Sequence, residues 1–165
     1  MRYTADMKTT SFTVLPETDQ ALLREAAGRL AHSLNKVSNP RTSVIATTAS
    51  GKYFGNNIFL SNCTLLCGEA SALSAAVAAN DARIEALYLT VGRADTQAPK
   101  IISPCGNCRQ MLHDFASLNG KPIAVYSATS LLDDVMVTDS EELLPAGFKS
   151  ASLGKMAEST ITQAS

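Results

Sequence analysis

The feature that most constrains this chain is the position of three cysteines relative to two predicted helix starts. Cys67 directly precedes the Ala- and Leu-rich segment Gly68–Asn80, and Cys105 and Cys108 form a C-x-x-C pair that opens a second helix running through Phe115. The N-terminus of a helix presents free N–H groups and a positive dipole end, which lowers the pKa of a thiol and favours the thiolate that binds metals. If the two helix starts face each other, they present three thiolates to one Zn²⁺.

The three thiols leave one position of a tetrahedral zinc site open. Three protein ligands with water in the fourth position are typical of a catalytic zinc site, whereas a structural site is usually closed by a fourth protein ligand. Glu69 lies two residues beyond Cys67, at the start of the predicted helix. Its carboxylate is expected to point away from the Cys67 side chain, toward whatever lies beside the metal. Glu69 is therefore the candidate proton carrier.

Other interpretations of these residues stay open at this point. Cys105 and Cys108 are also compatible with a redox dithiol or a structural zinc knuckle, although no second C-x-x-C exists to close a structural site. Cys63 has no assigned partner. His32 and His113 fall within helical patterns, and we exclude both from the metal.

The rest of the sequence alternates helical and strand patterns. The expected elements are an amphipathic helix from Thr18 that ends before Asn39, a β-hairpin of Ser43–Thr48 and Lys52–Ile58, the helix after Cys67, a strand over Ile84–Val91, the helix after Cys105 and a strand over Pro122–Tyr126. This order predicts an α/β domain with a mixed sheet. We expect residues 1–17 to form an irregular arm, residues 18–148 to form the domain and residues 149–165 to form a tail.

Composition and charge exclude several classes of function. With 165 residues, of which 45% are hydrophobic, the chain can bury the core of one domain. Its formal charge is -1 and its Lys and Arg residues are scattered, so we expect no nucleic-acid partner. No apolar run approaches the roughly 20 residues of a membrane span, and the N-terminus lacks an uninterrupted apolar signal core. We therefore expect no membrane partner and a cytoplasmic, reducing location, where cysteines favour metal or redox chemistry over disulfides.

Several segments resemble the cytidine deaminase family in its three-cysteine form. In chain order they are the hairpin with Gly55 and Asn57, Cys67-Gly68-Glu69, Pro104-Cys105-Gly106-Asn107-Cys108-Arg109-Gln110, and the stretch from Leu143 to Phe148. Together they cover most of the chain, roughly from Leu22 to Phe148. Their order along the chain makes the resemblance more specific than a single C-x-x-C.

The resemblance implies a fold, a cofactor and a reaction. The fold is a three-layer α/β/α fold with a central mixed sheet, assembled as a homotetramer, and the cofactor is one Zn²⁺ held by Cys67, Cys105 and Cys108. The reaction is the hydrolytic deamination of cytidine, deoxycytidine or a related aminated pyrimidine nucleoside, as in pyrimidine salvage. Glu69 takes a proton from the zinc-bound water, hydroxide attacks C4, and Glu69 returns the proton to N3 and to the departing ammonia. The residues placed at the substrate are Asn57, Phe59, Gly68, Ser103 and Phe148.

The chain departs from the family pattern at two positions. Ala70 stands where typical small members have an Arg that hydrogen-bonds the thiolates. Arg109 is the nearest candidate to compensate, and blasticidin S deaminases also lack that Arg. Phe59 stands where the typical members have a Glu that binds the ribose hydroxyls, and no acidic residue occurs between Lys52 and Gly68. These departures favour two alternatives: a deaminase of a modified nucleoside such as blasticidin S, or a non-catalytic, zinc-stabilised binding module.

Two of the expected substrate contacts also have a structural alternative. Asn57 is suited to satisfying the hairpin turn. Phe148 is suited to the core of the domain, whereas the family resemblance implies that it approaches the pocket of a neighbouring subunit.

Overall fold

The computed structural model of the chain describes residues 8–35, 40–62, 65–93 and 100–149. The expectations for Cys63 and for the tail after Lys149 concern residues outside these ranges.

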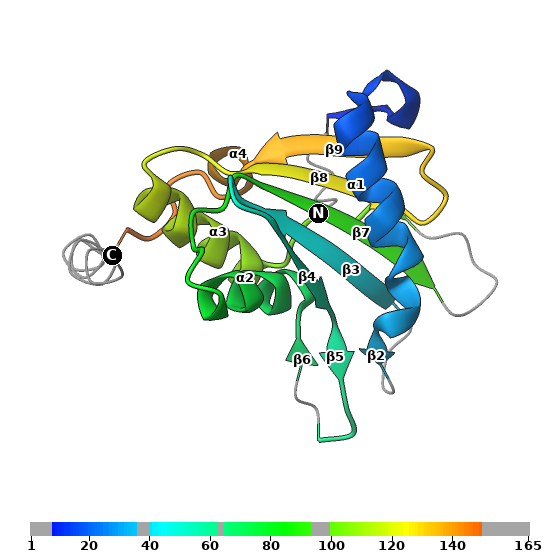
Figure 1. Cartoon of the computed structure of the whole chain (residues 1–165), viewed down its shortest axis with the longest axis horizontal. Coiled ribbons are helices and arrows are strands. Elements are labelled where there is room, and N and C mark those ends of the chain that lie inside the picture. The colour runs from blue at the N-terminus through cyan, green and yellow to red at the C-terminus, as the bar shows by residue number, and fades with distance from the viewer. Residues whose placement is uncertain (1–7, 36–39, 63–64, 94–99, 150–165) are drawn as a thin grey trace, which may run out of the picture.

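A mixed sheet of six strands forms the centre of the fold (Figure 1). In spatial order the strands are β1 (Thr9–Ser11), β9 (Asp134–Asp139), β8 (Ala124–Thr129), β7 (Ala86–Arg93), β3 (Pro40–Thr47) and β4 (Lys52–Asn56). β7 and β8 run parallel, and every other neighbouring pair is antiparallel. A parallel pair needs a crossover connection, which α3 (Gly106–Asn119) supplies. The expected hairpin corresponds to β3 and β4, and the two expected strands correspond to β7 and β8.

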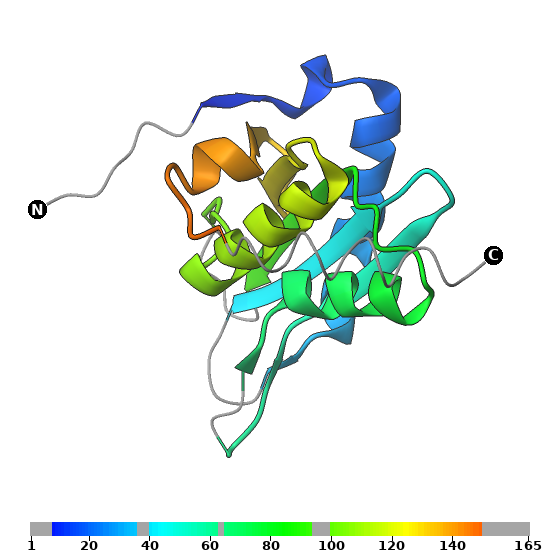
Figure 2. The same ribbon diagram turned by 90° about the vertical axis from the view of Figure 1, so that its left-hand side faces the viewer.

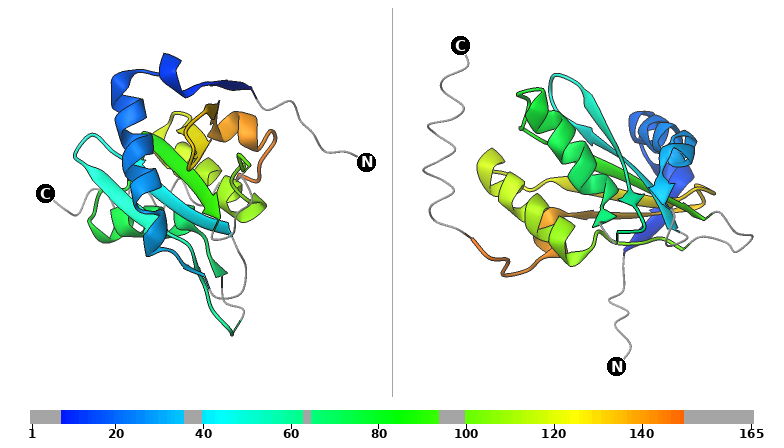
Figure 3. Two further views of the ribbon diagram at one scale, coloured as in Figure 1. Left: turned by 90° about the vertical axis from the view of Figure 1, so that its right-hand side faces the viewer. Right: turned by 90° about the horizontal axis from the view of Figure 1, so that it is seen from below.

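Helices cover both faces of this sheet (Figure 3). α1 (Glu17–Gly28) packs on one face, against β7 and β3. α2 (Gly68–Ala78), α3 and the short α4 (Ser140–Leu143) pack on the other face. The expected α/β fold with a central mixed sheet is thereby confirmed. Among the described residues, no helix has the length and apolar character that crossing a membrane requires.

Residues of the central strands alternate between two cores, because successive side chains of a strand point to opposite faces. Val44 and Ala46 belong to the core under α2 and α3, whereas Ile45 between them belongs to the core under α1. In the same way, Leu87 belongs to the core under α2 and α3, and Tyr88 belongs to the core under α1. β3 and β7 are thus covered on both faces, which explains why 44–46 in β3 and 86–89 in β7 are unbroken apolar runs rather than alternating sequences.

A second, three-stranded sheet projects from one end of the main sheet (Figures 1 and 2). It consists of β2 (Leu34–Asn35), β5 (Ile58–Phe59) and β6 (Leu65–Leu66). β5 follows β4 after Asn57, and β6 pairs antiparallel with β5 and leads directly into Cys67. The small sheet therefore connects an edge of the main sheet to the first helix start that carries a predicted ligand.

The start of α2 lies directly against β4 at Gly55. A Cβ atom at Gly55 would lie 2.2 Å from the Gly68 carbonyl oxygen and 2.3 Å from the Ala72 backbone nitrogen. Because both are backbone atoms, no side-chain rotation relieves the overlap. The missing side chain of Gly55 therefore sets how closely the helix start with Cys67 and Glu69 approaches the sheet.

Replacing Gly55 by alanine should lower the free energy of unfolding by about 1–3 kcal/mol, the usual cost of overpacking a filled interior. Thermal unfolding of the metal-free protein measures this loss. Gly51→Ala is the matched control, because a Cβ atom at Gly51 meets nothing within 4 Å. Equal stability of the two variants would show that β4 and α2 are not in this close contact.

α1 is shorter than the sequence predicts. It ends at Gly28, a 3₁₀ turn (Leu30–His32) follows, and the chain then enters β2 instead of continuing as a helix. Arg29, between α1 and this 3₁₀ turn, has φ -95° and ψ 1°, outside the α-helical range. Leu34 continues the helical spacing of the apolar residues, but its pairing with Ile58 in the small sheet decides its conformation.

Part of the expected irregular arm belongs to the main sheet. β1 pairs antiparallel with β9, a 3₁₀ turn (Phe12–Val14) follows, and Phe12 is buried in the core under α1. The expectation of an irregular arm is wrong for these residues. A three-residue strand carries no periodic signal of its own, and its partner β9 has only three consecutive apolar residues bounded by Asp and Thr.

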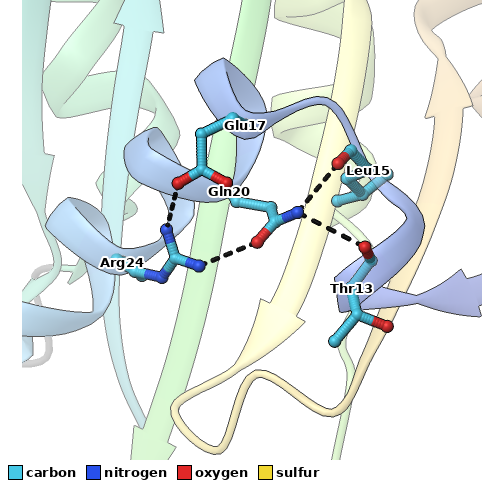
Figure 4. A network of polar contacts seen from close by, with 5 residues as sticks. All are labelled: Thr13, Leu15, Glu17, Gln20 and Arg24. Carbon is cyan, nitrogen blue, oxygen red and sulfur yellow. Dashed lines mark hydrogen bonds and ion pairs between the residues drawn. The ribbon is translucent and has the colours of Figure 1, made fainter.

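A polar network ties this N-terminal segment to α1 (Figure 4). Gln20 Nε2 donates to the Leu15 carbonyl at 2.8 Å and to the Thr13 carbonyl at 3.4 Å. Arg24 in turn donates to Gln20 Oε1 at 2.7 Å and to Glu17 Oε1 at 3.0 Å. The network holds the segment next to the position where β1 covers the otherwise open edge of β9.

Candidate metal centre

The three predicted ligand thiols lie together at the starts of α2 and α3. The Sγ atoms of Cys67, Cys105 and Cys108 all lie within 4.8 Å of one another. Those of Cys67 and Cys105 are 3.7 Å apart, and all three cysteines are free of disulfides. Elsewhere in the described part of the chain, no three His, Cys, Asp or Glu side chains are grouped so that they could hold a metal.

The local backbone places each thiol at a helix start. Cys67 is the N-cap residue of α2, with φ -70° and ψ 151°, and Cys105 is the N-cap residue of α3, with φ -66° and ψ 164°. An N-cap residue with this extended backbone directs its side chain toward the first turn of the helix. Cys108 is the third residue of α3, so the C-x-x-C spacing puts two thiols at one helix start. The packing of α2 brings the third thiol to them.

This group fits a zinc ion in chemistry and spacing. Thiolates are preferred zinc ligands at about 2.3 Å, so two sulfur atoms on one tetrahedral ion lie about 3.8 Å apart. The 3.7 Å between the Cys67 and Cys105 Sγ atoms agrees with this value. Three thiolates leave a fourth position for water or substrate, which is the pattern of a catalytic rather than a structural zinc site.

Burial opposes the ionisation of two of these thiols when no metal is bound. Burial raises the pKa of Cys67 to about 11, and the hydrogen bond with Cys105 adds to this. Burial and the nearby Glu69 carboxylate raise the pKa of Cys108. Burial acts on Cys105 too, but the Cys108 backbone N–H and the neighbouring thiols outweigh it and lower the pKa. The lowering expected at a helix start is therefore wrong for Cys67 and Cys108 in the metal-free chain, and holding three thiolates requires a cation.

Glu69 lies in the first turn of α2 and is buried beside the thiols. The residue is 5% exposed. Burial raises the pKa of the Glu69 carboxyl above its usual value, and hydrogen bonds from its own backbone N–H and from Cys108 offset this only in part. A carboxyl in such an environment is able to gain and lose a proton closer to neutral pH than one in water.

The Arg109 guanidinium is bonded to oxygen acceptors. It donates to the Pro104 carbonyl at 2.8 Å, to the Ser103 hydroxyl at 2.9 Å and to the Leu143 carbonyl at 3.4 Å. The expected compensation for the missing Arg at Ala70 is therefore not made through hydrogen bonds from Arg109 to the thiols. Its donors serve the loop before α3 and the end of α4 instead.

Asn57 is bonded to the backbone of β3. It is 6% exposed, its Oδ1 accepts from the Thr42 N–H at 2.9 Å, and its Nδ2 donates to the Pro40 carbonyl at 3.1 Å. These bonds lie at the open end of the hairpin and not at its turn, where Thr48 Oγ1 accepts from the Gly51 N–H. Asn57 therefore has a structural role, but not the one considered for it. Its contact with a substrate stays a prediction.

The other residues expected at the substrate lie on three different parts of the fold. Gly68 is buried directly after Cys67, Phe59 is half-buried in the small sheet, and Ser103 lies in the loop before α3. Phe148 is 72% exposed, so its assignment to the core is wrong. Its approach to a neighbouring subunit stays a prediction, as do the substrate contacts of the other three.

Neither histidine belongs to the thiol group. His32 is exposed in the 3₁₀ turn after α1, and His113 is buried in the middle of α3. The group of side chains suited to a metal contains the three cysteines and no histidine.

The sequence did not reveal how α4 and the segment after it are attached to α3. Gln110 Nε2 donates to the Phe148 carbonyl at 2.9 Å, and Arg109 Nη1 donates to the Leu143 carbonyl. Both donors belong to the motif that follows Cys108. Because the acceptors are backbone carbonyls, no residue type at their positions signals the contact.

Solved cytidine deaminases share this fold. The structure from Burkholderia pseudomallei is 27% identical, with a TM-score of 0.65, over 78% of this chain and 97% of that chain. The one from Mycobacterium leprae is 27% identical, with a TM-score of 0.58, over 76% of this chain and 95% of that chain. The one from Bacillus anthracis is 17% identical, with a TM-score of 0.62, over 86% of this chain and 96% of that chain, and supports the fold alone. No protein-family model and no curated protein matches the sequence. The resemblance to the cytidine deaminase family that the motifs indicate is confirmed.

Proposed function

We propose that this chain, which resembles the cytidine deaminases in fold and in its group of three cysteines, is a zinc-dependent hydrolase that deaminates an aminated pyrimidine nucleoside. The observation that carries the proposal is a buried carboxyl, Glu69, beside three thiols within 4.8 Å of one another. The thiols of Cys67, Cys105 and Cys108 supply the zinc ligands. Three ligands and an adjacent proton carrier together favour catalysis over a purely structural metal.

The reaction exchanges an amino group for an oxygen from water. Bound zinc supplies Lewis acidity, which makes a water molecule acidic enough to react at neutral pH. The Glu69 carboxylate takes one proton from that water as the water oxygen bonds to the aminated carbon, and it delivers this proton to the adjacent ring nitrogen. It then takes the second proton from the new hydroxyl group and passes it to the amino group as the C–N bond breaks and ammonia leaves. One water is consumed, and one carbonyl and one ammonia are formed.

The raised pKa of Glu69 supports this double role. A carboxyl fully ionised at neutral pH accepts protons weakly, whereas one whose pKa is raised by burial both accepts and returns them. Glu69 is held in the first turn of α2, whose position depends on the contact of α2 with β4 at Gly55. The proton carrier therefore stands on a helix rather than on a mobile loop.

The surroundings of Phe59 favour a modified nucleoside as a second candidate substrate. Phe59 lies in β5 opposite Leu65, and the small sheet also exposes Ile58 and Leu66. No acidic residue between Lys52 and Gly68 is present to accept hydrogen bonds from ribose hydroxyls. A nucleoside whose sugar carries fewer hydroxyls than ribose suits these apolar side chains, and blasticidin S is the candidate of this class.

A panel of substrates tests the proposed activity. Zinc-loaded protein should release ammonia from at least one of cytidine, deoxycytidine and blasticidin S, with the change in ultraviolet absorbance that follows loss of the amino group. Glu69→Gln protein on the same panel is the control for contaminating deaminases. A strong preference for cytidine and deoxycytidine over blasticidin S would reject the second candidate. Zinc-loaded protein inactive on every member would favour the non-catalytic binding module.

We further propose a cytoplasmic role in pyrimidine salvage and assembly into a homotetramer. Leu34, Ile58 and Leu66 are exposed and lie side by side on the three strands of the small sheet, and they support an assembly because single chains rarely leave a contiguous apolar patch uncovered. Light scattering on the purified full chain should give four times the chain mass. A monomer at micromolar concentration would reject this assembly while leaving the metal chemistry unaffected.

A further inference from the structure

Arg109 joins two segments of the chain at the start of α3. Its backbone N–H donates to the Cys105 carbonyl at 2.9 Å. In its side chain, Nε donates to the Pro104 carbonyl at 2.8 Å and Nη2 donates to Ser103 Oγ at 2.9 Å. One residue thus binds three consecutive residues that end in a predicted ligand. Its remaining contact, from Nη1 to the Leu143 carbonyl at 3.4 Å, reaches the end of α4.

The loop that Arg109 holds has no helix or strand of its own. Residues 100–105 lie outside the regular elements, and Cys105 is exposed whereas Cys108 inside α3 is buried. A guanidinium is planar and presents its donors in a rigid fork, so two bonds from it fix two groups relative to each other. Fixing the Pro104 carbonyl fixes the peptide plane that leads into Cys105. The Cys105 carbonyl on the other side of its Cα atom is held by the Arg109 N–H. With both flanking peptide planes held, the directions open to the Cys105 side chain are few.

We propose that Arg109 is a positioning residue: by holding the Pro104 carbonyl, it aims the Cys105 thiol at the metal ion. The inference rests on the proposed function only in requiring that the three thiols bind zinc. Groups that orient metal ligands typically change metal affinity by about 10–100-fold when they are removed. Arg109 exerts this effect through the loop and not through a bond to sulfur.

Three variants separate positioning from other effects of Arg109. Arg109→Lys keeps the positive charge but replaces the rigid fork by a single ammonium group. Gln110→Ala removes the neighbouring bond to the Phe148 carbonyl and leaves every bond of the loop in place. Arg83→Ala removes an exposed arginine from the loop before β7 and controls for the loss of one positive charge.

Zinc affinity of the full chain, measured in competition with a chromophoric chelator, tests the positioning role. Arg109→Ala should raise the zinc dissociation constant by about 10–100-fold, and Arg109→Lys should raise it by an intermediate factor. Gln110→Ala and Arg83→Ala should bind zinc as wild type does. With Co²⁺ in place of zinc, the thiolate-to-metal charge-transfer band of Arg109→Ala should be weaker, because the Cys105 thiolate is displaced.

Wild-type zinc affinity and an unchanged Co²⁺ spectrum in Arg109→Ala would overturn the positioning role. Wild-type zinc affinity in Arg109→Lys together with weaker affinity in Arg109→Ala would also overturn it, since the positive charge alone would then explain the effect. If circular dichroism shows that Arg109→Ala does not fold, the affinity of Arg109→Lys decides, with wild-type affinity overturning the role. Wild-type protein that binds no zinc would instead reject the proposed function itself.

Discussion

Replacing Glu69 by glutamine should lower kcat for ammonia release by about 10²–10⁴-fold, the range that general acid–base catalysis contributes. Glutamine has nearly the same size, so the buried position in the first turn of α2 stays filled. Its amide neither accepts nor returns a proton at neutral pH, and the step from water to the ring nitrogen loses its carrier. Because Glu69 is not among the three grouped thiol ligands, the zinc content should stay the same.

The measurement pairs kcat with metal analysis on the same samples. Glu85→Gln is the matched control, because Glu85 is an exposed carboxylate that pairs with Lys121 at 3.4 Å. It should keep wild-type kcat and zinc content. A Glu69→Gln protein with wild-type kcat would refute the role of proton carrier, and one that loses its zinc would show that Glu69 acts on the metal instead.

Replacing Cys108 by serine should abolish stoichiometric zinc binding. Metal-binding free energies of about 10–16 kcal/mol over four ligands correspond to about 2.5–4 kcal/mol per ligand, or a loss of about 70–900-fold in affinity. Cys108 is fully buried, so no other side chain can take the place of the serine at the metal. A neutral hydroxyl is also a much poorer zinc ligand than a thiolate.

Metal analysis after dialysis against a weak chelator gives the zinc content of this variant. Cys63→Ser is the matched control, since Cys63 lies outside both motifs and should leave the content unchanged. Activity should disappear together with the zinc in Cys108→Ser. Full zinc content in Cys108→Ser, or loss of zinc in Cys63→Ser, would show that the ligand set is wrong.

The main elements of the fold and the helix starts that carry the thiols follow from signals that are local in the sequence. The hairpin, α2, α3, β7 and β8 each have several consecutive residues with one period or one composition, and the order of these elements determines the layers. Cys67, Cys105 and Cys108 are grouped because each lies at a helix start and the two starts meet at one end of α2 and α3. The helix starts are written in short stretches of sequence, whereas their meeting depends on the packing of α2 against β4 at Gly55.

The remaining features depend on contacts between distant residues. Leu34 continues the helical spacing of α1 yet forms a strand, because β5 is available as a partner. Thr9–Ser11 forms a strand only because β9 lies beside it. The bonds of Arg109 end on a loop hydroxyl and backbone carbonyls, and the raised pKa of Cys67 comes from burial, which the sequence of a helix start does not report.

Hydrolysis in water enriched in oxygen-18 tests the proposed chemistry most directly. Zinc-loaded wild-type protein, incubated with the aminated nucleoside that it converts fastest, should release one ammonia for each product molecule. Mass spectrometry of that product should find one heavy oxygen, taken from water, at the carbon that carried the amino group. Zinc-loaded protein that releases no ammonia from any nucleoside of the panel, or a product without the heavy oxygen, would contradict a zinc-dependent hydrolytic deaminase.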